Sequence, residues 1–264
     1  MLTKTINLSL QKILPSRIYF NLLKWKRGYE EPELKLVKHL CDENLISIDV
    51  GAANGLYLSH LYSVSAKCYA FEPRITALEN LKRMFSGISS SIQFENVALS
   101  NFSGFTEMKI LKSNSTLSTI ESGNLIERFG DVDLAKVPVK RLDEYKLGGT
   151  VGFIKIDVEG HEEAVLEGSL ELLKRDKPSL LIEIEERHKP DSVASVSNFL
   201  TGQGYEGFFY LDEHLHRIES FDLKKYQNFG SNDVYIFNFI FVHQSKLSTI
   251  AHLLISTPAE RRVL

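Results

Sequence analysis

The sequence predicts a doubly wound α/β fold, in which helices cover both faces of a mostly parallel, seven-stranded sheet. The chain has 264 residues, of which 43% are hydrophobic, and a chain of this size can bury one large core. From residue 45 onward, short apolar runs alternate with amphipathic segments, which is typical of strands that are buried on both faces. A glycine turn ends the first apolar run, at the edge where such sheets hold ligands.

Seven apolar runs are the predicted strands, and we expect the last two to pair antiparallel and close the sheet. These runs are 45–50, 67–72, 92–97, 152–157, 179–185, 205–211 and 234–242. Between the strands, apolar residues at helical spacing predict helices that include 75–85, 161–174 and 191–201.

The stretch 101–150 interrupts this alternation. It contains two further candidate strands, 105–111 and 137–142, and a segment rich in Ser, Thr, Asn and Gly at 113–124. A long loop inside a compact domain is usually functional or mobile. We therefore expect this stretch to help shape a binding pocket.

The chain divides into a helical N-terminal appendage over 1–44, a main domain over 45–243 and a C-terminal tail, predicted to be helical, over 244–264. In the appendage, six cationic residues precede the first acidic residue, Glu30, and lie among apolar side chains: Lys4, Lys12, Arg17, Lys24, Lys26 and Arg27. This pattern fits a helix that packs on the core. The less favoured alternative is a surface for peripheral contact with an anionic membrane or a partner.

Charge and composition exclude several classes of function. The net charge of −3 and the pI near 6.3 predict no nucleic-acid partner. No run of about 18 apolar residues occurs, so we expect neither a transmembrane segment nor secretion. Cys41 and Cys68 form neither a disulfide framework nor a metal motif, and they predict packed thiols in a reducing, cytoplasmic compartment. The sequence does not indicate an oligomeric state.

The strongest local signal is the turn from Asp49 to Gly55. Gly51 permits a tight turn and Gly55 permits close approach of a helix, so that backbone amides can face a ligand. The turn lacks the G-x-G-x-x-G spacing of dinucleotide folds, because Ala53 occupies the position of the middle glycine. Asp49 would repel a phosphate but attract an ammonium group. The turn therefore predicts a ligand with an amino-acid moiety.

Glu72 ends the second predicted strand, 23 residues after Asp49. A carboxylate at about this spacing accepts hydrogen bonds from the two ribose hydroxyls of an adenosine-type ligand. A solvated strand end is the alternative for Glu72 taken alone. Together, Asp49 and Glu72 describe S-adenosylmethionine better than NAD.

Three titratable residues follow the fourth parallel strand, namely Asp157, Glu159 and His161. They should lie at the carboxyl edge of the sheet, where open α/β sheets bind ligands. The alternative is that the two acids only cap the first turn of the following helix.

These residues belong to a series of motifs that resembles the FkbM-type methyltransferases over about residues 45–186. The motifs are DVGAANG (49–55), AFEP (70–73), ENVALSN (95–101), STL (115–117), VPVKRLDEY (137–145), FIKIDVEGHEEAVLEG (153–168) and LLIEI (180–184). The resemblance implies a Rossmann-like class I methyltransferase fold, S-adenosylmethionine as cofactor, and O-methylation of a hydroxyl on a sugar, glycan or small metabolite.

By the same resemblance, ten residues would contact the cofactor, and Asp157 would join them at the methyl-transfer end. The ten are Asp49, Gly51, Ala52, Asn54, Gly55, Glu72, Pro73, Asn96, Val97 and Ala98. The chain departs from the family pattern at Ala53, where the family has Asn one position earlier than here, and at His161, where a small residue is frequent.

Methylation of a hydroxyl requires a base near the acceptor, or a metal that polarises it. Asp157, Glu159 and His161 are the candidate catalytic residues. Glu183 and Glu185 share one face of the fifth parallel strand and could join Asp157 in an all-oxygen Mg²⁺ site. We do not favour a metal, because carboxylates at strand ends are ordinary. His188 could contact substrate, although a loop histidine is more often solvated.

Two rival interpretations remain open. An NAD-dependent dehydrogenase or epimerase would share the glycine turn and the ribose acid, but the middle glycine and a Tyr-x-x-x-Lys pair are missing. A non-catalytic module that keeps the cofactor fold is the second rival.

Overall fold

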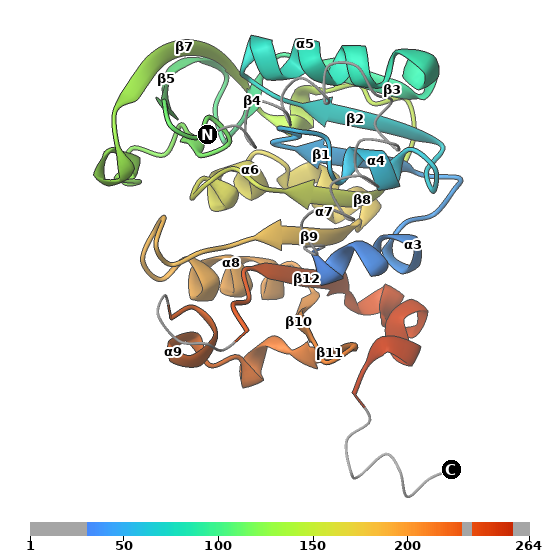
Figure 1. Ribbon diagram of the computed structural model, residues 1–264. Coiled ribbons are helices and arrows are strands. Elements are labelled where there is room, and N and C mark those ends of the chain that lie inside the picture. The colour runs from blue at the N-terminus through green and yellow to red at the C-terminus, as the bar shows by residue number, and fades with distance from the viewer. Residues whose placement is uncertain (1–30, 229–233, 256–264) are drawn as a thin grey trace, which may run out of the picture.

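The computed structural model describes residues 31–228 and 234–255 (Figure 1). Residues 1–30, and with them the basic N-terminal segment that suggested membrane contact, lie outside the described residues, as do 256–264. Within the described ranges, no helix has the length and apolar character needed to cross a membrane.

The main sheet has eight strands in the described part of the chain, one more than predicted. In chain order they are β1 (Ile46–Val50), β2 (Lys67–Phe71), β3 (Ile92–Glu95), β8 (Val151–Ile156), β9 (Ser179–Glu183), β10 (Tyr205–Leu211), β11 (His214–Arg217) and β12 (Asn238–His243). They are arranged β11-β10-β12-β9-β8-β1-β2-β3. The expected antiparallel pairing of the last two predicted strands is confirmed, since β10 pairs antiparallel with β12.

The predicted count of seven strands was therefore wrong, while the parallel arrangement holds for five of the eight strands. The four pairs from β3 to β9 are parallel, but β9, β12, β10 and β11 pair antiparallel, so the sheet is mixed. The unpredicted strand, β11, is polar and follows a tight turn at Asp212 and Glu213, both with positive φ. Neither residue is a glycine, so the usual signal of such a hairpin turn was missing.

A second sheet of four strands occupies the stretch that interrupted the alternation. Its order is β4-β7-β5-β6, with β4 at Ala98–Leu99, β5 at Gly104–Leu111, β6 at Ser118–Thr119 and β7 at Val132–Lys140. The candidate strand at 105–111 is confirmed and the one at 137–142 starts earlier. The predicted loop at 113–124 contains β6.

Helical segments cover both faces of the main sheet, which confirms the doubly wound arrangement (Figure 1). One face packs on α6 (Glu162–Glu167), α7 (Leu170–Asp176) and α8 (Ser192–Thr201). The other packs on η1 (Pro32–Lys35), α3 (Val37–Leu40), α4 (Leu58–Leu61), α5 (Ile75–Met84) and η6 (Gln244–Leu253). The helix expected over 161–174 is divided at Gly168 and Ser169.

Short segments complete the described chain: η2 (Ser86–Ser91), η3 (Ile126–Phe129), η4 (Leu142–Glu144), η5 (Ile218–Ser220) and α9 (Leu223–Tyr226). The predicted C-terminal tail begins as the 3₁₀ helix η6, whose Ile250 is buried in the core.

Candidate functional site

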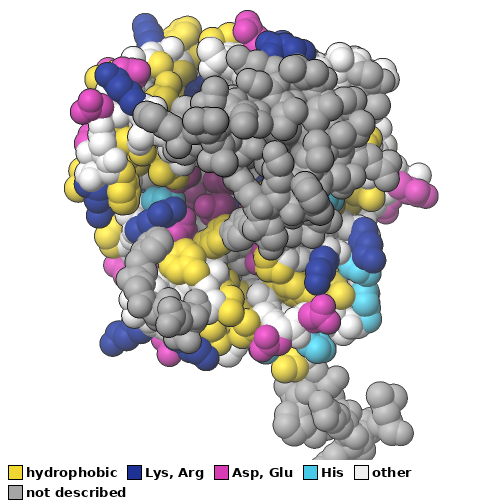
Figure 2. Space-filling view, in the orientation of Figure 1, with side chains coloured by type: hydrophobic (Ala, Val, Ile, Leu, Met, Phe, Trp, Pro, Cys, Tyr) yellow, Lys and Arg dark blue, Asp and Glu magenta, His cyan; other side chains and the backbone are white. Residues whose placement is uncertain are grey.

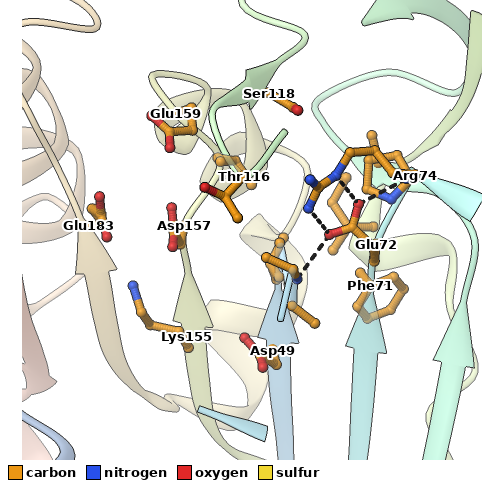
Figure 3. Close-up of a pocket in the computed structure, with 18 of the residues that line it drawn as sticks. Asp49, Phe71, Glu72, Arg74, Thr116, Ser118, Lys155, Asp157, Glu159 and Glu183 are labelled. Carbon is orange, nitrogen blue, oxygen red and sulfur yellow. Dashed lines mark hydrogen bonds and ion pairs between the residues drawn. The ribbon is translucent and has the colours of Figure 1, made fainter. Parts of the chain in front are cut away.

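A pocket of about 300 Å³ lies at the carboxyl ends of β1, β2, β8 and β9 (Figure 3). Second-sheet residues such as Met108 and Ser118 contribute to its wall. Of the predicted site residues, the lining includes Asp49, Gly51, Ala52, Asn54, Glu72, Pro73, Val97, Ala98, Asp157, Glu159, His161 and Glu183. Gly55, Asn96, Glu185 and His188 are not among the lining residues.

Strand alternation and register bring the central charges of the pocket together. Asp49 on β1 is in register with Lys155 on β8, and Ile156 with Ile182 on β9. Side chains alternate between the faces of a strand, so Asp49, Lys155 and Glu183 all project on the face that carries α3 and α4. Asp157 directly follows β8 at the same edge (Figure 3).

The two glycines of the turn have different roles. Gly51 has φ +80°, and a Cβ there would lie 1.9 Å from the carbonyl oxygen of Asp157. Its missing side chain therefore makes room for the end of β8. Gly55 has φ +79°, and its Cβ would meet Leu81 and Phe85. Gly55 serves helix packing, which explains why it does not reach the pocket.

Asp49 carries an unsatisfied polar atom. Its side chain is only 3% exposed, and Oδ2 has no hydrogen-bond partner. Burial raises the pKa of Asp49 to about 7; Lys155 opposes this rise, and Asp157 and Glu72 add to it. A buried polar atom without a partner is unfavourable unless a ligand or ion completes it.

Glu72 is held in place by several hydrogen bonds (Figure 3). Its Oε2 accepts from the amide of Ala53 at 2.9 Å and from Nη2 of Arg74 at 2.9 Å. Its Oε1 accepts from the amide and from Nε of Arg74, at 2.9 and 2.8 Å. Arg74 also donates to the carbonyl of Ser115. Arg74 therefore occupies the carboxylate that was predicted to bind ribose.

Asn96 acts behind this site. Its Nδ2 donates to the carbonyl oxygens of Glu72 and Pro73, at 3.0 and 2.8 Å. The amide fixes the loop after β2 and does not line the pocket.

A family model spans the pocket residues from Asp49 to Glu183. Residues 49–206 match the model of the methyltransferase FkbM domain. The chain belongs to the FkbM methyltransferase family. A search of curated proteins gave no match.

Solved structures agree with this family at the level of the fold. An FkbM methyltransferase from Methylobacillus flagellatus is 16% identical, with a TM-score of 0.51 over 83% of this chain and 50% of the other. This chain thus spans about half the length of that protein. An rRNA methylase from Streptococcus thermophilus (14% identity, TM-score 0.45, 81% and 97% covered) and M. capricolum TrmK with S-adenosylhomocysteine (13%, 0.39, 81% and 69%) are more distant.

In this FkbM domain, Asp157 and Glu183 face the pocket beside the buried Lys155. Burial raises the pKa of Asp157 to about 6, against the effect of Lys155 and with that of Glu159. Burial and the charge of Asp157 together raise the pKa of Glu183 well above its usual value.

Glu159 and His188 form a buried ion pair. The Nε2 of His188 lies 2.9 Å from Oε2 of Glu159, and His188 is only 5% exposed, so the expectation of a solvated loop histidine was wrong. Burial opposes the imidazolium, but Glu159 and Glu185 outweigh it and raise the pKa of His188. The carbonyl of Glu159 accepts from Thr119 and Asn124, which fixes its φ of +55°.

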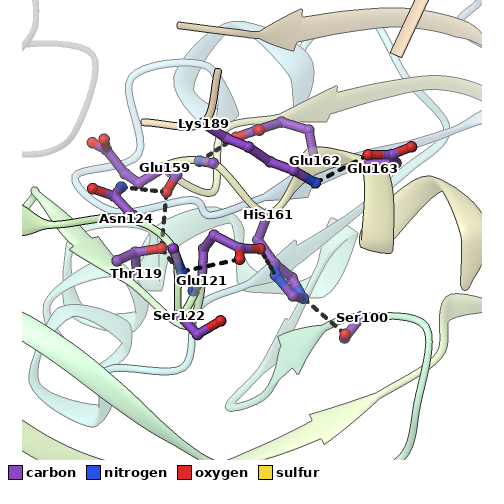
Figure 4. A network of polar contacts seen from close by, with 12 residues as sticks. Ser100, Thr119, Glu121, Ser122, Asn124, Glu159, His161, Glu162, Glu163 and Lys189 are labelled. Atoms are coloured by element: carbon purple, nitrogen blue, oxygen red, sulfur yellow. Dashed lines mark hydrogen bonds and ion pairs between the residues drawn. The ribbon is translucent and has the colours of Figure 1, made fainter. Parts of the chain in front are cut away.

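His161 belongs to a polar network between the two sheets (Figure 4). Its Nδ1 lies 3.0 Å from Oε2 of Glu121, and its Nε2 lies 2.8 Å from Oγ of the fully buried Ser100. Burial lowers the pKa of His161 despite the nearby carboxylate. Both ring nitrogens are therefore engaged by protein groups.

Glu185 is separate from the pocket. It lies beyond the end of β9 and bonds Arg187 and the hydroxyl of Tyr235. Across the described ranges, no three His, Cys, Asp or Glu side chains are grouped so that they could hold a metal ion.

Several lining residues were not predicted, among them Glu31, Tyr57, Arg74, Lys155 and Phe237. Lys155 did leave a signal, because a lysine inside an apolar strand buried on both faces needs a partner. Glu31 and Phe237 come from distant parts of the chain, and no local pattern marks them.

Proposed function

We propose that this FkbM domain transfers the methyl group of S-adenosylmethionine to a hydroxyl of a sugar, glycan or small metabolite. The unpartnered Oδ2 of Asp49 in an acid-rich pocket is the observation that carries the proposal. S-Adenosylmethionine is a cation at its sulfur and carries an ammonium group, and it supplies an electrophilic methyl group when bound. A pocket with excess carboxylates suits such a molecule.

The residues of the pocket fit this cofactor. Asp49 would accept from the ammonium, Glu72 would accept from the ribose, and Val97 and Ala98 offer an apolar wall for the adenine. A carboxylate has about four acceptor sites, and all four of Glu72 are used. Arg74 must therefore withdraw from Glu72 when the ribose binds.

Among the three candidate bases, the geometry favours Asp157. It lines the pocket, and with a pKa of about 6 it is mostly ionised at neutral pH and can take a proton from an acceptor. His161 has both nitrogens engaged, and Glu159 is paired with His188. His161 and Glu159 would then position the loop after β8.

The other expectations receive partial support. The acid-rich lining disfavours the pyrophosphate of NAD, which supports S-adenosylmethionine as the ligand of this pocket. We also propose a reducing compartment such as the cytoplasm, in which Cys41 and Cys68 would remain thiols.

The acceptor chemistry is tested by incubating the full chain with methyl-tritiated S-adenosylmethionine and fractionated extracts of glycans and small metabolites. We expect label in a product that keeps it through mild alkaline hydrolysis, as a methyl ether does. Boiled protein is the control. Label released as methanol, or label found on amines, would contradict O-methylation.

A further inference from the structure

Four carboxylates surround one buried ammonium group at the floor of the pocket. We call Asp49, Asp157, Glu183 and Glu31 the acid cluster. Figure 3 shows Lys155 among the first three of these acids. All five line the pocket, and all four acids act electrostatically on Lys155. With every group ionised, three negative charges lack a counter-charge within the cluster.

Lys155 is fixed by neutral groups. It is 1% exposed, and its Nζ donates to the carbonyl of Ile156 at 3.2 Å and to Oδ1 of Asn238 at 3.3 Å. It also lies 5.0 Å from the centre of the Tyr57 ring. Although burial favours the neutral amine, the acid cluster outweighs it and raises the pKa of Lys155. The ammonium is therefore permanent.

Carboxylates that act on one another favour bound protons, because each ionised carboxylate raises the free energy needed to ionise the next one. Within the cluster, the pKa of Asp49 is about 7 and that of Asp157 about 6, chiefly through burial. The other charged groups that act on the cluster do not remove the excess. Glu72 is paired with Arg74, Glu159 with His188 and Glu185 with Arg187. Glu33 is buried, and its pKa is raised to about 7. Acidic side chains gather near the centre of this face of the molecule (Figure 2).

We propose that the acid cluster responds to the charge of the ligand: it holds a proton when the pocket is empty and releases it when a cation binds. The inference rests on the proposed function. It implies that the pocket distinguishes the cofactor, whose sulfur is cationic, from the product of methyl transfer, whose thioether sulfur is neutral. The two molecules differ by one positive charge.

This behaviour also balances the reaction. When the acceptor oxygen gains the methyl group, the sulfur takes the electrons of the broken carbon–sulfur bond and becomes neutral. The hydroxyl loses its proton, and the acid cluster takes up that proton in place of the lost positive charge. The charge at the floor of the pocket then stays constant, and the sulfur of the product, now neutral, is no longer attracted by the carboxylates.

Calorimetric titration of the full chain with two probes tests the proposal. One is S-adenosylhomocysteine, and the other is sinefungin, which carries an ammonium where the cofactor has its sulfonium. Titrations at about pH 6.5 in two buffers of different ionisation enthalpy, with chelator present, count the protons released. We expect more protons released by sinefungin. Its affinity should also rise more steeply with pH, by up to about tenfold per unit for each proton released.

Variants assign the effect to the cluster. Asp157→Asn and Glu183→Gln should each reduce the difference between the two probes, and Glu171→Gln, on the exposed side of α7, should leave it unchanged. Binding of both probes with equal proton release and equal pH dependence would overturn the charge response alone. If the folded chain binds neither probe, the proposed function fails as well.

Discussion

A buried carboxylate in a ligand pocket can serve as a base, as a charge or only as a structural anchor, and its partners distinguish these roles. Asp157 lines the pocket among several charged neighbours. Glu159, by contrast, is paired with His188, and both ring nitrogens of His161 are hydrogen-bonded. Of the three candidate bases, our proposal therefore assigns the proton transfer to Asp157.

At the scale of the residue, we predict that Asp157→Asn lowers the single-turnover rate of methyl transfer by about 10²–10⁴-fold, the usual contribution of a positioned base. The amide keeps the shape but cannot take the proton. His161→Gln should change the rate far less, and S-adenosylhomocysteine affinity in both variants serves as the control for an intact pocket. A full rate in Asp157→Asn with a lost rate in His161→Gln would reverse the assignment.

The residues that end parallel strands could be predicted from the sequence, whereas the partners of their side chains could not. Asp49, Glu72 and Asp157 were predictable because the carboxyl ends of parallel strands meet at one edge. The ion pair of Glu72 with Arg74 was not, because sequence adjacency does not tell which way a side chain points. Gly55 shows the converse, since a glycine needed for helix packing and one needed for a ligand look alike in sequence.

At the scale of the element, the second sheet depends on a close approach to the helix pair α6 and α7. Gly168, between these helices, would place a Cβ 1.9 Å from the carbonyl oxygen of Ser100, which follows β4. Ser100 in turn contacts His161, so the same junction holds the wall of the pocket.

We therefore predict that Gly168→Ala lowers the free energy of unfolding by roughly 1–3 kcal/mol or more, because backbone must shift to admit the methyl group. Gly123→Ala is the matched control, since a Cβ there meets only the side chain of Glu121 at 3.7 Å. Urea unfolding of both variants provides the comparison. Equal midpoints for the two would show that the junction is loose.

The sequence did not predict that the strands form two separate sheets. Alternation in the second sheet is weak, and the two-residue strands β4 and β6 are shorter than any pattern can mark. β5 and β7 are longer, at eight and nine residues, and β5 was predicted nearly whole, whereas only the end of β7 was.

At the scale of the whole molecule, buried acids should control how stability depends on pH. Burial raises the pKa values of Asp49, Glu33 and Glu162 to about 7. The folded state therefore binds protons that the unfolded state has lost between about pH 4.5 and 7, and the stability that these acids contribute falls as pH rises through this window. Neutral, buried His161 acts in the opposite direction.

Asp157 and Glu183 also have raised pKa values, so five such acids outnumber the three histidines with lowered pKa values, His39, His161 and His243. We therefore predict a higher urea midpoint at about pH 5.5 than at about pH 7.5. Asp49→Asn should flatten this dependence, because it removes one of the titrating groups. A midpoint that is higher at the more alkaline pH would contradict the assignment of buried, protonated acids.

The doubly wound core was predictable because its strands are mostly apolar and its helices carry one apolar face. The strand count was not, because β11 and its turn lack both signals.

We infer that Oδ2 of Asp49 is kept without a partner for the ammonium of S-adenosylmethionine, and one paired measurement tests this inference. Calorimetric titration with S-adenosylhomocysteine, which retains that ammonium, is combined with thermal melting of wild type and Asp49→Asn. We predict that wild type binds, and that Asp49→Asn binds at least about tenfold more weakly, as expected for a charge-assisted hydrogen bond. The variant should melt at the same or a higher temperature, because it lacks the buried carboxylate whose Oδ2 has no hydrogen-bond partner. Equal affinities in the two folded proteins, or binding of NAD in place of S-adenosylhomocysteine, would contradict the account.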